Sequence, residues 1–177
     1  MSDRFYEIIG IADRIVAKYN TRNPFVLAQE LDIDVVERNF KKQNGAYNVV
    51  LNNDFIFIKQ SLCEELKIIV LAHEIGHCIL HRDEAIKYGG LKDCNVFDKQ
   101  NIVMEKEANL FASQVLISDE EVLEMLKLGY NVSQTASALN VDKNLVAIKA
   151  DVLSAKGCMN NNFEYKIDFM KNIDVKS

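Results

Sequence analysis

The segment LKIIVLAHEIGHCILH, residues 66–81, contains three histidines, of which His73 and His77 form the pattern H-E-x-x-H inside a strongly apolar stretch. Residues 62–82 have one glycine and no proline, which predicts a long helix with a buried middle. Side chains four positions apart on a helix differ by only about 40° in direction, so His73 and His77 project from one face and can hold a single Zn²⁺. Glu74 is turned about 100° from His73, which places it beside the metal as a general base.

A catalytic zinc ion usually has three protein ligands, so a third must come from elsewhere in the chain. The remaining histidine, His81, rises about 12 Å above His73 on the same helix, and we interpret it as a packing or supporting residue. The predicted helix 101–117 offers two carboxylates, Glu107 at about 60° and Glu105 at about 100° from the centre of its apolar stripe. A metal would neutralise the carboxylate that is buried there. We therefore expect Glu107 as the third ligand, with Glu105 in reserve as a residue of a solvated face.

The composition indicates one ordinary globular domain with room for a small appendage. The chain has 177 residues, of which 49% are hydrophobic and 27% are charged, and its formal net charge of −5 disfavours general binding to nucleic-acid phosphates. No apolar run reaches the roughly 18 residues of a membrane-spanning helix, and the start does not resemble a signal peptide, so we expect a cytoplasmic protein. The four cysteines lack metal-binding spacing and are expected to be reduced, with Cys78 a buried and inert thiol.

Hydrophobic periodicity predicts an α+β fold that is mostly helical, with a small antiparallel three-stranded sheet packed on the helix of residues 62–82. Asn52-Asn53 is expected to form the hairpin turn between the last two strands. The predicted strands are residues 33–40, 46–51 and 55–59. The other predicted helices are residues 2–19, 24–31, 101–117, 118–129, 134–140 and 143–156. Capping boxes are expected at Ser61 with Glu64 and at Ser118 with Glu121, whereas residues 83–98 show no periodicity and are expected to be irregular.

Three regions follow from this pattern: a core of residues 1–117, a helical subdomain of residues 118–157 and a loosely ordered tail of residues 158–177. Residues 133–156 look like a helix-turn-helix, the arrangement of many DNA-binding proteins. Residues 118–157 contain four lysines and six acidic residues, however, which leaves a local charge of −2. We therefore expect this subdomain to pack on the core or to bind a protein partner rather than DNA.

Two segments, HEIGHCILH from His73 and EKEANLFASQVLI from Glu105, together resemble the ImmA/IrrE metallopeptidases. The pattern of this family is an H-E-[LI]-G-H helix followed by E-x-E-A-N-x-F-A, and the similarity extends over about residues 1–157. The resemblance implies a zincin-like fold and a zinc-dependent, gluzincin-like site, with His73, His77 and Glu107 as ligands and Glu74 as general base. The sequence departs from the family at residues 116–118, which replace a common Leu-Met-Pro, and at residues 68–70, which are aliphatic.

Such a site is expected to hydrolyse peptide bonds, with Glu74 accepting a proton from water and returning it to the leaving amine. Tyr47, Tyr88 and His81 are all candidates to donate a hydrogen bond to the developing oxyanion, and the sequence does not choose between them. The resemblance implies that the substrate is a transcriptional repressor of the helix-turn-helix type, often encoded nearby on a prophage or another mobile element. The alternative hypothesis is a regulatory module with this fold that binds a protein, or less favourably DNA, without hydrolysis.

Overall fold

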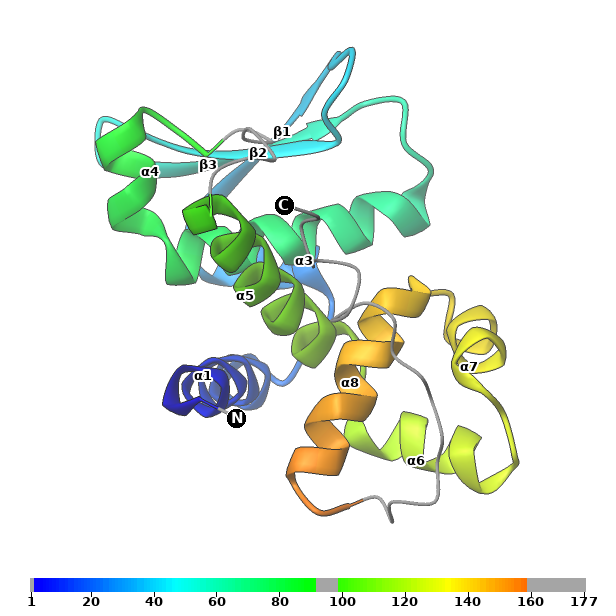
Figure 1. The fold of residues 1–177 in the computed structure, drawn as a ribbon. Coiled ribbons are helices and arrows are strands. Elements are labelled where there is room, and N and C mark those ends of the chain that lie inside the picture. Colours follow the sequence, from blue (N-terminus) through cyan, green and yellow to red (C-terminus); the bar gives the residue numbers. More distant parts are fainter. Residues whose placement is uncertain (1, 92–98, 159–177) are drawn as a thin grey trace, which may run out of the picture. The chain divides into compact units, whose positions relative to one another are not determined.

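The computed structural model describes residues 2–91 and 99–158, which form eight helices and three strands (Figure 1). In chain order these elements are α1 (Asp3–Tyr19), α2 (Pro24–Glu30), β1 (Ile33–Arg38), β2 (Gly45–Val50), β3 (Asn53–Lys59), α3 (Glu64–Leu80), α4 (Arg82–Tyr88), α5 (Lys99–Leu116), α6 (Asp119–Lys127), α7 (Val132–Leu139) and α8 (Lys143–Ala155). They divide into two compact units, residues 1–118 and residues 119–177. The fold is thus α+β and mostly helical, as predicted. None of the described helices is both long and apolar enough to span a membrane.

The sheet of the first unit is mixed, and the prediction of an antiparallel sheet is wrong for one pair. The strand order is β1-β3-β2, with β2 antiparallel to β3 and β1 parallel to β3. β3, in the central position, carries the buried Ile56 and Ile58, whereas the edge strand β1 has one buried and three exposed positions. The other edge strand, β2, has three buried positions and one exposed position. Consecutive strands often pair, but here the third strand separates the first two.

Helix α3 is buried between the sheet on one side and α2 and α5 on the others. Leu71 and Ile75 on α3 are fully buried, as are Tyr47 and Ile56 of the sheet, and α3 packs against β2 and β3 at the centre of the first unit. The helix begins at Glu64, after Cys63 as N-cap, with no side-chain capping hydrogen bond. The capping box predicted at Ser61 is therefore wrong, although the helix itself is confirmed.

Helix α5 packs between α1 and α3. Gly76 permits a close approach to α3, because a Cβ atom placed there would lie only 3.1 Å from the Cα of Ala108. At the other end of α5, the guanidinium of Arg22 donates hydrogen bonds to the backbone oxygens of Gln114 and Val115 at 2.7 Å and 3.0 Å. These bonds satisfy carbonyl groups that a helix end otherwise leaves without partners.

Helix α4 occupies residues that were predicted to be irregular. His81 interrupts the α-helical backbone after α3, with φ −133° and ψ 27°, and the chain then forms two further turns before Gly89 stops them at φ 71°. The prediction failed because so short a helix shows little periodicity. Leu91 then donates its N–H to Tyr47 of β2 at 2.9 Å. The rest of the predicted irregular segment, residues 92–98, lies outside the described residues, as does Cys94.

The second unit contains α6, α7 and α8. α7 begins after Asn131, which forms a capping box with Gln134, so the helix starts two residues before the predicted range 134–140. α8 begins at residue 143, as predicted, after Asp142, whose side chain accepts from the N–H of Asn144 at 2.7 Å. Lys149 is 1% exposed and forms an ion pair with Asp119 at the start of α6. The roles predicted for residues 1–117 and 118–157 remain predictions, and nearly all of the predicted tail lies outside the described residues.

Candidate metal centre

His73 and His77 lie one turn apart on α3 and face one another, as the H-E-x-x-H spacing predicts. Their Nε2 atoms are 3.0 Å apart, and the ring centroids are 4.7 Å apart. The side chain of His77 is 4% exposed and that of His73 is 18% exposed. The pair therefore forms a semi-enclosed donor site that remains accessible from one side.

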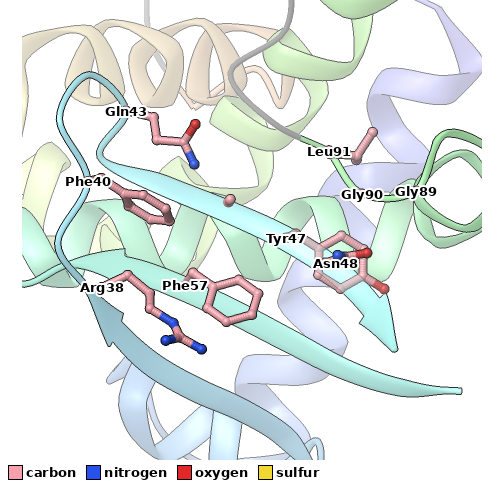
Figure 2. Close-up of a pocket in the computed structure, with 10 residues that line it drawn as sticks. Arg38, Phe40, Gln43, Tyr47, Asn48, Phe57, Gly89, Gly90 and Leu91 are labelled. Atoms are coloured by element: carbon pink, nitrogen blue, oxygen red, sulfur yellow. The ribbon is translucent and has the colours of Figure 1, made fainter. Parts of the chain in front are cut away.

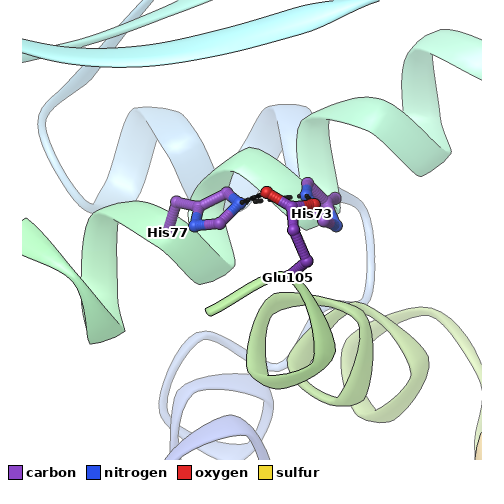
Figure 3. A group of neighbouring side chains, drawn as sticks. All are labelled: His73, His77 and Glu105. Carbon is purple, nitrogen blue, oxygen red and sulfur yellow. Dashed lines mark hydrogen bonds and ion pairs between the residues drawn. The ribbon is translucent and has the colours of Figure 1, made fainter. Parts of the chain in front are cut away.

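The carboxylate of Glu105, from α5, completes this group (Figure 3). One of its oxygens lies 3.2 Å from Nε2 of His73, and the other lies 3.2 Å from Nε2 of His77. In a tetrahedral zinc site with bonds of about 2.0–2.2 Å, neighbouring ligand atoms are about 3.3 Å apart. The three separations come close to this value, so His73, His77 and Glu105, called here the ligand triad, fit a single divalent cation.

Glu107, which was predicted as the third ligand, lies elsewhere. Its Oε2 atom is 3.1 Å from Nε2 of His81 and 2.9 Å from Nη2 of Arg4 on α1. The structure brings Glu105, which was held in reserve, to the two imidazoles instead. Glu105 and Glu107 differ by about 200° around α5, so one of the two must leave the face that meets α3.

The prediction chose the wrong face of α5 as the one that meets α3, because this helix is buried on more than one side. The centre of its apolar stripe reflects contacts with both α1 and α3, whereas a ligand must lie on the side of α3 alone. Small residues would have revealed that side. Ala108 lies against Gly76 of α3, and Glu105, with Asn109 one turn beyond it, reaches the histidines beside this contact.

Each imidazole of the ligand triad is held by a partner at its second nitrogen. Nδ1 of His73 lies 3.0 Å from Oδ1 of Asn109, and Nδ1 of His77 lies 3.0 Å from Nδ1 of His81. An amide oxygen can only accept, so Nδ1 of His73 donates to Asn109, and in the neutral imidazole that a metal requires the lone pair is on Nε2. Such partners fix the tautomer and the orientation of metal-binding histidines. Asn109 was not predicted as a site residue, although it follows Glu105 by four positions and therefore lies on the same face of the helix.

The electrostatics of the ligand triad favour a cation. Burial raises the pKa of Glu105, but hydrogen bonds with His73 and His77 outweigh it and hold the pKa well below the usual range. Burial lowers the pKa of His77, whereas at His73 the hydrogen bond that the imidazole donates to Glu105 outweighs burial and raises the pKa. Glu105 is therefore ionised and His77 is neutral at pH 7, which are the forms that metal ligands require.

Glu74, the predicted general base, is 6% exposed and is not a member of the ligand triad. Its carboxylate lies directly against the backbone of strand β2. A Cβ atom built on Gly45 would fall 2.5 Å from Oε1 of Glu74 and 2.7 Å from Cγ1 of Val70. The absence of a side chain at Gly45 is therefore what makes room for the carboxylate.

The candidates for oxyanion stabilisation differ in availability. The hydroxyl of Tyr47 donates to Oδ1 of Asp54 at 2.5 Å, and the Tyr47 side chain is fully buried. His81 is engaged by His77 and Glu107, whereas Tyr88 is 54% exposed. Cys78 is 6% exposed and burial raises the pKa of its thiol to about 11, which agrees with an inert role.

A separate cavity of about 270 Å³ lies between the sheet and residues 89–91 (Figure 2). Its lining includes Phe57 and Arg38, whose guanidinium lies 5.4 Å from the centre of the Phe57 ring. Because side chains alternate along a strand, Phe57 points away from the face of β3 that carries Ile56. No member of the ligand triad lines this cavity, so it does not belong to the candidate metal centre.

Two known proteins that are similar to this chain come from a Bacillus phage and from Bacillus subtilis. The chain is 29% identical over 146 residues to an uncharacterised immunity region protein of Bacillus phage phi105, and this match covers 81% of this chain and 90% of that protein. It is 24% identical over 131 residues to metallopeptidase ImmA of Bacillus subtilis, and this match covers 72% of this chain and 74% of that protein.

A solved structure and a family model extend the comparison. The fold resembles that of a Mycobacterium tuberculosis transcriptional regulator, with a TM-score of 0.56 at 12% identity; the match covers 81% of this chain but only 46% of that one. This similarity concerns the fold alone. The model of the IrrE N-terminal-like domain, Peptidase_M78, matches residues 28–151, which include every residue of the ligand triad. The chain therefore belongs to the family of IrrE N-terminal-like domains and is a distant homologue of metallopeptidase ImmA.

Proposed function

We propose that this protein is a zinc-dependent endopeptidase in which His73, His77 and Glu105 hold the metal and Glu74 is the general base. The observation that carries the proposal is that the Nε2 atoms of His73 and His77 and the carboxylate of Glu105 lie 3.0–3.2 Å from one another. A second carboxylate, that of Glu74, is buried on the helix that carries the two histidines. Glu105 replaces Glu107 in the ligand set that the resemblance implied. The similarity to a metallopeptidase supports the same reaction class.

The chemistry divides between the cation and the protein. Bound Zn²⁺ would supply Lewis acidity, which lowers the pKa of water and polarises a carbonyl group. Glu74 would accept a proton from the attacking water on a carboxylate oxygen and then deliver it to the leaving nitrogen. A carbon–oxygen bond forms, the carbon–nitrogen bond breaks, and the products are a carboxylic acid and an amine. Asn109 and His81 keep the two imidazoles oriented during this cycle.

The proposed substrate is a transcriptional repressor of the helix-turn-helix type, whose cleavage would relieve repression. Support comes from the relatives, since one is a phage immunity region protein and another is the metallopeptidase ImmA. The second unit, with a charge of −2 over residues 118–157, has little attraction for DNA and is a better candidate to contact such a protein.

The test combines metal analysis with cleavage by the full chain. The zinc-loaded protein is incubated with the helix-turn-helix protein encoded nearest to its own gene and, in parallel, with a peptide library prepared from a bacterial proteome. New amino termini are identified by mass spectrometry. Glu74→Gln should retain one zinc per chain and lose cleavage by about 100-fold or more, because a general base typically contributes 10²–10⁴ in rate.

Glu64→Gln is the matched control, because Glu64 lies on the same helix and its side chain is 76% exposed. This control should cleave as the wild type does. Cleavage by Glu74→Gln at the wild-type rate would refute the assignment of the base. If Glu74→Gln kept the full regulatory effect of the wild type in cells, the alternative of a binding module that acts without hydrolysis would be favoured.

A further inference from the structure

We propose that His81, Glu107 and Arg4, called here the outer triad, set the zinc affinity of the site by fixing the tautomer of His77. The proposal rests on the metal centre put forward above. It also makes the N-terminal helix α1 a part of that centre, although α1 lies before residue 28, where the family match begins. The outer triad thus gives an element outside the matched region a direct influence on the metal.

The outer triad forms a continuous series of hydrogen bonds from the surface to the ligand triad. Arg4 contacts Glu107 through Nη2 at 2.9 Å and through Nε at 3.2 Å. Oε2 of Glu107 lies 3.1 Å from Nε2 of His81, and Nδ1 of His81 lies 3.0 Å from Nδ1 of His77. Exposure falls along the series, from 40% for the Arg4 side chain to 16% for Glu107 and 4% for His81.

The direction of each hydrogen bond determines the next. A carboxylate paired with a guanidinium can only accept, so Nε2 of His81 must donate to Glu107. Neutral His81 then has a lone pair at Nδ1, which accepts the proton on Nδ1 of His77. His77 is thereby left with a lone pair at Nε2, the atom that faces Glu105 and His73. The opposite tautomer of His77 would place a proton where the metal must bind.

The two imidazoles of the ligand triad are supported in different ways. Nδ1 of His73 is held by Asn109, which lies on α5 one turn beyond Glu105. The partner of His77 is His81, which is bonded to Glu107 on α5, and Glu107 is bonded in turn to Arg4 on α1. Loss of Arg4 would free Glu107 to rotate toward water, and His81 would then lose the acceptor that selects its tautomer. Docking of α1 and retention of zinc are coupled in this way.

The experiment measures the zinc affinity of the full chain by competition with a chromophoric chelator, together with the unfolding free energy of the metal-free protein. Glu107→Gln and His81→Phe are expected to weaken zinc binding by about 10-fold to 100-fold, the usual cost of removing a partner of a ligand histidine. Arg4→Gln should weaken it by about threefold to tenfold, because it loosens Glu107 without removing it. Lys18→Gln is the matched control, since Lys18 lies on α1 and its Nζ donates to the hydroxyl of Tyr19, its neighbour in the chain.

The decisive measurement is the double variant. If the three residues act in series, Arg4→Gln adds no further loss once Glu107 is already Gln, so the two effects are not additive. Additive effects, or affinities of Arg4→Gln and Glu107→Gln within twofold of the wild type, would overturn the proposal. A wild-type chain that binds no zinc would overturn the metal centre as well, whereas zinc binding that is lost in Glu105→Gln but unchanged in the outer-triad variants would overturn this inference alone.

Discussion

Gly45→Ala is expected to disable the proposed base without disturbing the metal ligands. The new Cβ atom would lie 2.5 Å from Oε1 of Glu74 and 2.7 Å from Cγ1 of Val70, both too close for real atoms. The φ angle of Gly45 is not among the positive values of the backbone, so alanine itself fits the local conformation. The strain is therefore relieved chiefly by rotation of Glu74, whose carboxylate is the end of a flexible side chain.

The magnitude follows from the size of this displacement. An ordinary carbon–oxygen contact is longer by about 1 Å, so the carboxylate must move by roughly that amount. A misplacement of about 1 Å in a catalytic group can cost about 100-fold in rate, and loss of the base altogether costs 10²–10⁴. We expect turnover to fall about 100-fold, while zinc affinity changes by less than about twofold because Glu74 is not a member of the ligand triad.

The assay compares initial cleavage rates at saturating substrate, with the zinc content of each preparation measured by mass spectrometry. Gly10→Ala is a matched control, because its Cβ would meet only the flexible end of Arg14 at 3.3 Å. It should cleave at the wild-type rate. Full activity in Gly45→Ala would refute the reasoning, because it would mean that the observed position of Glu74 is not required for the reaction.

Two further substitutions test the packing of each unit. Gly76→Ala places a Cβ atom 3.1 Å from the backbone of Ala108, so α3 and α5 must separate. We expect the zinc affinity to fall about tenfold. The unfolding free energy, measured in urea, should fall by about 1 kcal/mol, because the cost of overpacking exceeds the gain in helix propensity. Unchanged affinity would show that this close approach does not position the ligands. Burial raises the pKa of Asp119, but hydrogen bonds from Lys149 and Lys156 outweigh it, so the pKa in the folded chain lies below 3.8. Asp119→Asn should cost about 2 kcal/mol at pH 7, and the difference from wild type should shrink as the pH falls below about 4, because protonation then removes the same ion pairs in the wild type. A difference that stays constant down to pH 2 would contradict this origin.

Local signals in the sequence predicted most of the helices. α1, α2 and α8 begin within one residue of their predicted starts, where Ser2, Pro24 and Asp142 act, because caps and first-turn residues act through neighbours in the chain. The H-E-x-x-H spacing likewise determines the pairing of His73 and His77, since both lie on one helix.

The features that the sequence did not predict depend on contacts between distant segments. The central position of β3 is a choice between partners that all three strands could make, and no single strand's pattern distinguishes it: β2 has three buried positions and β3 has two. The third member of the ligand triad depends on which side of α5 meets α3. An average over the apolar residues of α5 could not separate that side from the one facing α1, whereas the small residues Gly76 and Ala108 do so.

The placement of two donor atoms on a single helix also bears on how the chain is made. His73 and His77 need only one turn of local structure to come together, but Glu105 emerges from the ribosome 28 residues after His77. In the proposed centre, a nascent α3 can therefore capture a cation before α5 has been synthesised, and the carboxylate closes over it afterwards. Metal supply during translation would then influence the yield of native protein, and not only its activity once folded.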